Sequence, residues 1–173
     1  DVDKISSIEI SKIKESQIST ADKNIIQSNK NLISDYETYS KKGLINYINE
    51  VEKNTLDKWE VSKITGYLER KFIKGLPGKM IGDKYPANFG LIPNTLLPLK
   101  YGGDGNPLKA ILIGDNINQG EIVETMPLGV IKTSYLGENN HKIILIKASN
   151  KKNIDQTDIY KDEIIRILDS FKK

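Results

Sequence analysis

YGGDGNPLKAILI, residues 101–113, joins a glycine-rich loop to an almost uninterrupted apolar run. Glycines at 102, 103 and 105 permit backbone conformations that other residues avoid, and Pro107 restricts the end of the loop. The apolar residues from Leu108 to Ile113 predict a buried strand directly behind it. A loop of this form suits a divalent cation, provided that it carries closely spaced oxygen ligands.

The loop has the backbone of such a site but little of its negative charge. Asp104 is its one acid, Asn106 is a neutral amide, and Lys109 is a cation. Asp104 has two interpretations that the sequence leaves open, because Asp-Gly is also a common turn pair. It is either a residual cation ligand or a turn former.

Other segments on both sides of the loop resemble one family, the soluble family I inorganic pyrophosphatases. In chain order the similar segments are EVEK (50–53), KWEV (58–61), YPANFGLIPNTL (85–96), MPLGVIK (126–132), GENNHKII (137–144) and EIIRILDSFKK (163–173). The family patterns that they resemble are EIPKG, KYEV, YPANYGFIPxTL, RPxGVLKM, GEEDxKII and EIxRFFEDYKK. The loop lies where the family has DxDPxD, and the similarity extends from about residue 43 to the C-terminus.

The resemblance implies a mainly β (α+β) fold, a small OB-like closed barrel with flanking helices. It also implies Mg²⁺-dependent hydrolysis of pyrophosphate by cytoplasmic enzymes. It assigns the family's acids to positions that here are Glu50, Glu60, Asp104, Asn106, Lys109, Tyr135 and Asn140. It assigns phosphate-binding lysines to Lys58, Lys142 and Lys172, a phosphate-binding arginine to Phe72, and two substrate-side tyrosines to Phe89 and Phe171.

These substitutions predict a pseudoenzyme. A lysine ammonium 4 Å from a divalent ion is repelled by on the order of 8 kcal/mol at an effective dielectric constant near 20. The missing oxygens at Asn106, Tyr135 and Asn140 weaken metal binding further. We therefore expect no catalytic residues and no cofactor, with Asp104 as the remaining candidate metal ligand. Lys109 could instead replace a lost metal electrostatically by pairing with Glu50, Glu60 or Asp104.

Lys58, Lys142 and Lys172 are then candidates for binding phosphate-type anions, although solvated surface lysines are the ordinary interpretation. Two other functions stay open. An active Mg²⁺ pyrophosphatase would need substitute acids, for which the candidates are Asp83, Asp115, Glu121, Glu124 and Glu138. An OB-type binder of single-stranded nucleic acid or glycan could stack its ligand on Trp59, Tyr67 or Tyr135.

Composition favours a single ordinary core. The chain has 173 residues, 38% hydrophobic and 28% charged, and a formal net charge of +3. That charge is too small to indicate nucleic acid binding by itself. The absence of cysteine and the single histidine, His141, argue against zinc sites and cysteine nucleophiles. No apolar run has the length of a membrane span.

The partner is expected to be an unknown protein, a phosphate-containing ligand or a second copy of the chain. The compartment stays open, because the first residue is Asp and a removed export signal is compatible with that start, and a tether-like arm is compatible with surface anchoring.

Two regions are predicted. Residues 1–40 are expected to form a helical arm or tether, with a helix after Ser19-Thr20 that carries Ile25, Ile26, Asn29, Leu32, Ile33, Tyr36 and Tyr39 on one face. Residues 41–173 are expected to form the barrel, with a strand at Trp59–Val61, a return strand from Tyr67, and strands near 108–113, 121–133 and 142–148. Residues 75–103 are expected to be mostly irregular. A final helix is predicted over about 156–171, with Ile164, Leu168 and Phe171 on its apolar face.

Overall fold

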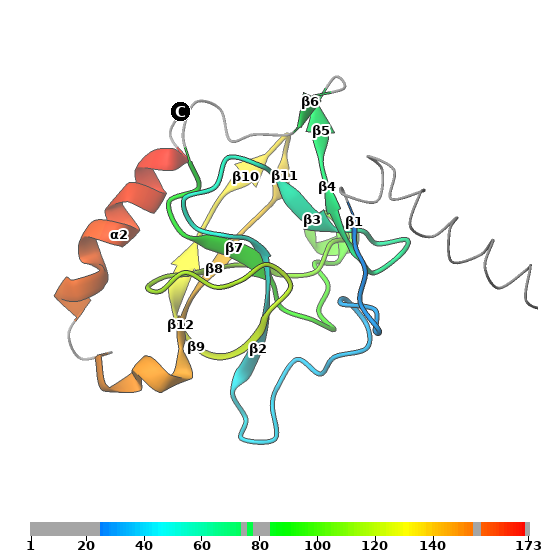
Figure 1. The fold of residues 1–173 in the computed structure, drawn as a ribbon. Coiled ribbons are helices and arrows are strands. Elements are labelled where there is room, and N and C mark those ends of the chain that lie inside the picture. The colour runs from blue at the N-terminus through cyan, green and yellow to red at the C-terminus, as the bar shows by residue number, and fades with distance from the viewer. Residues whose placement is uncertain (1–24, 74–75, 78–83, 154–156, 172–173) are drawn as a thin grey trace, which may run out of the picture.

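The centre of the molecule is a closed β-barrel. The structure is a computed structural model that describes residues 25–73, 76–77, 84–153 and 157–171. The barrel strands follow the spatial order β12-β8-β7-β2-β9. Their bounds are Ile45–Val51 for β2, Asn88–Leu91 for β7, Lys109–Leu112 for β8, Ile122–Ile131 for β9 and Lys142–Lys147 for β12. Figure 1 shows these strands wrapped around one another, with the C-terminal helix outside them.

The barrel is antiparallel except where β8 pairs with β12 in parallel. The register of β2 against β7 shifts between Asn49 and Val51, so that Glu50 has no cross-strand partner in this pair. Such a bulge bends the strand and changes the direction of a side chain. Gly90 on β7 pairs with Asn49, next to the bulge. A Cβ atom at Gly90 would come within 2.0 Å of the Ile48 carbonyl oxygen. This close approach of two backbones requires glycine.

Two apolar clusters fill the barrel and the space under the helix. One contains Tyr47, Ile92, Leu112 and Leu145, and the other contains Ile111, Ile144, Ile146 and Ile167. The predictions for the strands near 108–113, 121–133 and 142–148 are confirmed to within a few residues. The prediction that residues 75–103 are mostly irregular is confirmed for the described residues of this range, and the regular elements that it did not foresee are β6, β7 and η2. The prolines and glycines around β7 indicated a loop, and the apolar run of this short strand is too brief to show a strand period.

A three-stranded sheet lies beside the barrel in the order β1-β4-β3. β3 is Trp59–Val61 and β4 is Leu68–Arg70, which confirms the predicted strand and its return. β1 is only Ile25–Ile26. The smaller elements are β5 (Phe72–Ile73), β6 (Leu76–Pro77), η2 (Leu99–Tyr101), β10 (Ser134–Tyr135), β11 (Glu138–Asn139) and η3 (Ala148–Asn153).

The helix predicted in the N-terminal arm is wrong for residues 25–40. They form β1 and a series of turns, while residues 1–24 lie outside the described residues. The Asn31 side chain accepts hydrogen bonds from the backbone N–H groups of Ile33 and Ser34, an arrangement that stabilises a turn. Leu32 is buried in a third cluster with Ile48 and Leu68. Tertiary burial of Leu32 and local side-chain hydrogen bonds outweigh the helical period of the apolar residues.

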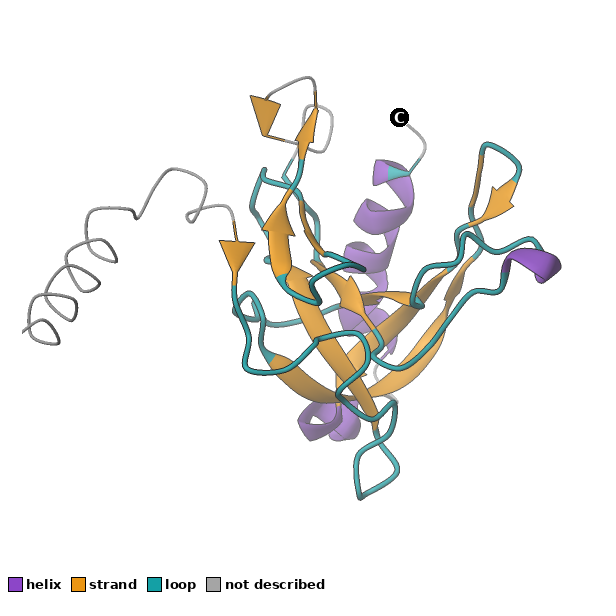
Figure 2. Cartoon of the chain, turned by 90° about the vertical axis from the view of Figure 1, so that its right-hand side faces the viewer, coloured by secondary structure: helices purple, strands orange, loops and turns teal. Residues whose placement is uncertain are grey.

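Helix α2, Thr157–Ser170, confirms the predicted C-terminal helix, but its buried face is different. Tyr160, Glu163 and Ile167 point to the core, whereas Leu168 is 40% exposed and Phe171 is 38% exposed. The Glu163 carboxylate accepts hydrogen bonds from the Lys53 ammonium at 3.1 Å and the Gly114 N–H at 3.1 Å. This ion pair joins the helix to the segments that follow β2 and β8, and Figure 2 shows the helix packed on the outside of the barrel strands. Among the described residues, no helix is long and apolar enough to cross a membrane.

Candidate functional site

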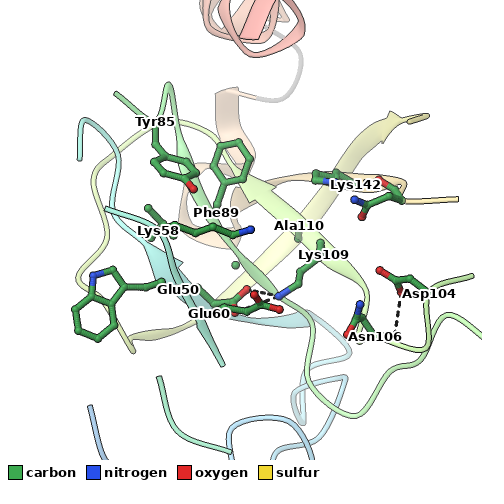
Figure 3. A pocket seen from close by; sticks show the side chains of 14 residues that line it. Glu50, Lys58, Glu60, Tyr85, Phe89, Asp104, Asn106, Lys109, Ala110 and Lys142 are labelled. Carbon is green, nitrogen blue, oxygen red and sulfur yellow. Dashed lines mark hydrogen bonds and ion pairs between the residues drawn. The ribbon is translucent and has the colours of Figure 1, made fainter. Parts of the chain in front are cut away.

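A cavity of about 270 Å³ opens at the side of the barrel where β2, β3, β7 and β8 come together. It brings together side chains that are far apart in the sequence (Figure 3). The positions singled out from the sequence that line it are Glu50, Lys58, Trp59, Glu60, Phe89, Asp104, Asn106, Lys109, Asn140 and Lys142.

The remaining sequence candidates lie elsewhere or cannot be described. Lys172 lies outside the described residues, as do the side chains of Phe72 and Tyr135. The substitute acids Asp115, Glu121, Glu124 and Glu138 do not line the cavity, and Asp83 lies outside the described residues. His141 is half-buried beside the site and accepts a hydrogen bond from the Thr133 N–H at 3.1 Å.

An ion pair between Glu50 and Lys109 forms the inner wall of the cavity. The Lys109 ammonium donates to the two Glu50 carboxylate oxygens at 2.8 and 3.1 Å, and Glu50 Oε2 also accepts the Val61 N–H at 2.6 Å. Only 4% of the Glu50 side chain is exposed. Burial lowers the pKa of Lys109, but attraction to Glu50 and Glu60 outweighs it, so the net pKa is raised. Of the three acids considered as partners for Lys109, Glu50 makes the direct contact.

The bulge in β2 explains why these two side chains meet. Glu50 sits at the register shift on β2, and Lys109 begins β8, two strands away with β7 between them. A regular β2 would alternate its side chains strictly between the two faces. Glu50 and Lys109 both line the cavity, as does Gly90 of the strand between them, and the bulge allows the Glu50 side chain to lie on this side.

The loop before β8 is folded by its own side chain. The Asp104 carboxylate accepts the Asn106 N–H at 2.9 Å, and Gly105 has a φ of +70°. Burial raises the pKa of Asp104, but the hydrogen bonds from Asn106 lower it by more, so the net pKa is reduced. The turn-forming interpretation of Asp104 is therefore observed directly, and the same side chain also lines the cavity.

Lys142 lies across from Lys109 on the neighbouring parallel strand. Its ammonium donates to the Asn140 carbonyl at 2.9 Å and lies 5.5 Å from the centre of the Phe171 ring. Burial, followed by repulsion from Lys109, lowers the pKa of Lys142 to about 8. Lys58 is exposed at the mouth of the cavity, and Figure 3 shows its amine directed into the space between Phe89 and the acids.

Tyr85 is a member of the site that the motifs did not single out. It is 7% exposed, lines the cavity, and makes an edge-on contact with Phe89 at a centroid distance of 5.0 Å. Burial, with Glu50 and Glu60 nearby, raises the pKa of Tyr85 to about 12. Its position three residues before β7 could have suggested a role, but a tyrosine in a segment with apolar residues is more often part of a core.

A family model described as inorganic pyrophosphatase matches residues 47–173. The chain belongs to the inorganic pyrophosphatase family. It is 30% identical over 107 residues to the inorganic pyrophosphatase of Xylella fastidiosa strain 9a5c, which covers 61% of this chain and 54% of the relative. It is 31% identical over 116 residues to that of Helicobacter pylori strain 26695, with 66% and 60% covered. The chain thus spans little more than half the length of these relatives.

Solved pyrophosphatase structures share the fold. The Helicobacter pylori inorganic pyrophosphatase superposes with a TM-score of 0.60 at 24% identity. The aligned region covers 77% of this chain and 76% of the Helicobacter pylori chain. The Toxoplasma gondii type I enzyme has a TM-score of 0.62 at 23% identity, with 68% and 58% covered. The expected pyrophosphatase fold, a closed OB-like barrel with a C-terminal helix, is confirmed.

Proposed function

We propose that this pyrophosphatase-family chain binds phosphate-type anions without a metal and does not hydrolyse pyrophosphate efficiently. One observation carries the proposal. The ammonium of Lys109, at a position where the resemblance assigns a metal-binding aspartate, is bonded to both oxygens of Glu50. A cation attached to the chain thus neutralises a carboxylate that a metal would otherwise use.

The remaining oxygen donors fit a multi-metal centre poorly. Asp104 is engaged in its own turn, and Asn106 and Asn140 supply neutral amides at best. Across the part of the chain that the structure describes, no group of three or more His, Cys, Asp or Glu side chains could hold a metal ion. Hard divalent cations need several oxygen ligands, preferably charged. The donor set therefore does not suit the family's magnesium cluster.

Anion binding is supported by the cations that Glu50 leaves free. Lys58 and Lys142 line the cavity beside Lys109. The Lys142 ammonium bonds to a neutral carbonyl, and among the described residues no ion pair of Lys142 with a carboxylate is found. Buried or half-buried ammonium groups without a neutralising partner attract anions, and the low local dielectric strengthens that attraction.

Mg²⁺-dependent pyrophosphate hydrolysis is the second candidate, because the relatives named above are all called inorganic pyrophosphatases. This function would require the Glu50–Lys109 pair to open and Lys109 to leave the cavity. The aspartates missing at Asn106, Lys109 and Asn140 would still have to be replaced by other oxygen donors.

A phosphate-release assay with pyrophosphate and Mg²⁺ separates the two candidates. We expect the parent protein and Lys109→Asp to release no phosphate above a no-protein control, because one new carboxylate does not complete the donor set. Turnover by the parent at ordinary enzyme rates, ~1–1000 per second, would establish the second candidate instead. In parallel, calorimetry with inorganic phosphate in EDTA should show binding that weakens in Lys142→Gln and persists in Lys161→Gln, an exposed lysine on α2.

A further inference from the structure

One wall of the cavity is aromatic. Tyr85 and Phe89 form this wall, and the centre of the Phe171 ring lies 6.4 Å from that of Phe89. Trp59 also lines the cavity, and it packs against the cluster of Leu32, Ile48 and Leu68. Figure 3 shows the Tyr85 and Phe89 rings on one side of the Lys58 amine, with Glu50, Glu60 and Lys109 on the other. Aromatic faces that border open space gain free energy when a flat apolar group covers them.

The opposite wall carries balanced charge. Once Lys109 has neutralised Glu50, the charged residues that remain among the described lining residues are Lys58 and Lys142 against Glu60 and Asp104. Pyrophosphate carries several negative charges. Without a metal to screen them, Glu60 and Asp104 repel the second phosphate while the two lysines attract the first. This balance favours a ligand with a single anionic group.

The size of the cavity limits the rest of the ligand. About 270 Å³ is slightly below the range of roughly 300–1,000 Å³ typical of pockets for drug-sized molecules. One ring and one phosphate fill such a space, whereas a larger ligand would extend into solvent.

We infer that the cavity takes a small organic monophosphate whose phosphate meets Lys58 and Lys142 and whose planar aromatic group lies against Phe89 and Tyr85. This inference rests on the proposed function, since it names the ligand class of the same metal-free site. The aromatic wall supplies the affinity that a metal-free site cannot obtain from charge alone.

Trp59 makes the inference testable, because it is the only tryptophan of the chain and lines the cavity. In EDTA, its emission is followed while phenyl phosphate, methyl phosphate, phenol or pyrophosphate is added, and calorimetry checks each titration. Phenyl and methyl phosphate carry the same anionic group and differ in the ring. We expect phenyl phosphate to bind about tenfold more tightly than methyl phosphate, the gain typical of stacking one ring on an aromatic side chain. Phenol and pyrophosphate should both bind more weakly than phenyl phosphate.

Variants test whether the preference for phenyl phosphate over methyl phosphate comes from the aromatic wall. Phe89→Leu keeps an apolar side chain and should bring the affinities for phenyl and methyl phosphate close together. Phe171→Leu, at a half-exposed position, is a second test if Phe89→Leu unfolds. Tyr101→Leu removes an exposed aromatic ring outside the cavity and should leave the tenfold ratio unchanged.

The outcomes separate this inference from the proposed function. Equal affinity for phenyl and methyl phosphate would overturn the aromatic subsite while leaving anion binding intact. Tightest binding of pyrophosphate in EDTA would do the same, and so would phenol binding as tightly as phenyl phosphate. If none of the phosphates bound, both the inference and the proposed anion site would be wrong.

Discussion

Glu50 and Lys109 form an ion pair in which each charge compensates the other. Glu50 is almost fully buried, and its carboxylate is held by the Lys109 ammonium and the Val61 N–H. Removing one charge from a buried pair leaves the other without compensation, which costs more than the pair contributes.

Lys109→Met should therefore lower the free energy of unfolding by about 3 kcal/mol, the lower end of the range for broken buried pairs. Urea unfolding monitored by circular dichroism measures the change. The double variant Glu50→Gln/Lys109→Met should recover most of the loss, because neither charge then remains. Equal losses in the single and double variants would show that packing of the Lys109 stem, and not the charge, is responsible.

Lys142 makes stability depend on pH with an unusual sign. Its pKa falls from 10.5 in the unfolded chain to about 8 in the folded protein. Between these values the unfolded chain binds the proton and the folded protein does not, so stability rises as pH increases from about 8 toward 10.5. Below pH 8 both states are protonated, and the cost of burying the ammonium is fully present.

Lys142→Met should consequently stabilise the protein at pH 7 and reduce the rise of stability between pH 8 and 10. Urea midpoints at pH 7, 8, 9 and 10 measure both effects. Lys161→Met, which removes an exposed lysine, should leave the slope as it is in the parent protein. A parent protein whose midpoint falls steadily above pH 8 would contradict the assignment. The proposed anion binding should weaken over the same window, because the attracting charge is lost.

At the scale of elements, helix α2 shows how two apolar stripes can compete. Its sequence places Ile164, Leu168 and Phe171 on one face and Tyr160, Ile164 and Ile167 on another. The second face is the buried one, with Ile167 fully covered. The Glu163 carboxylate, bonded to the Lys53 ammonium and the Gly114 N–H, lies on that same face.

Ile167→Ala should lower the free energy of unfolding by about 2–5 kcal/mol, the cost of deleting a buried aliphatic side chain and leaving a cavity. Leu168→Ala removes a neighbouring side chain that is 40% exposed, and its effect should be clearly smaller. Chemical denaturation of the two variants side by side is the measurement. Similar losses would mean that the helix is rotated relative to the structure described above.

At the scale of the whole molecule, the proposed function implies that stability is independent of magnesium. If the folded state bound a metal ion whose free concentration was 100 times the dissociation constant, the ion would stabilise that state by about 2.7 kcal/mol. For a chain of this size, such a gain corresponds to roughly 5–10 °C in melting temperature. We expect instead the same melting temperature in EDTA and in excess MgCl₂.

Sodium chloride at matched ionic strength separates specific binding from screening of surface charge. An increase of several degrees with MgCl₂ alone would indicate a bound ion and favour the hydrolytic alternative. An increase with both salts would reflect charge screening and would leave the proposal standing.

The order of the motifs along the chain was sufficient to predict the barrel, its main strands and the C-terminal helix. These predictions used local signals: the alternation of apolar residues, turn-forming glycines and family-like segments. Each signal is contained in a short stretch of the sequence. The same signals also identified most of the cavity lining, because the loop at 104–106 and the strand beginning at Lys109 are adjacent in sequence.

The tertiary structure alone decided which acid Lys109 contacts, which face of α2 is buried, and that residues 25–40 form turns against the barrel. Glu50 and Lys109 are separated by 59 residues, and their contact depends on the bulge in β2 and on the closure of the barrel. Such contacts arise from strand register and from competition for burial between distant segments. Neither strand register nor this competition produces a periodic pattern within one stretch of the sequence. The sequence therefore offered three partners for Lys109 and did not distinguish among them.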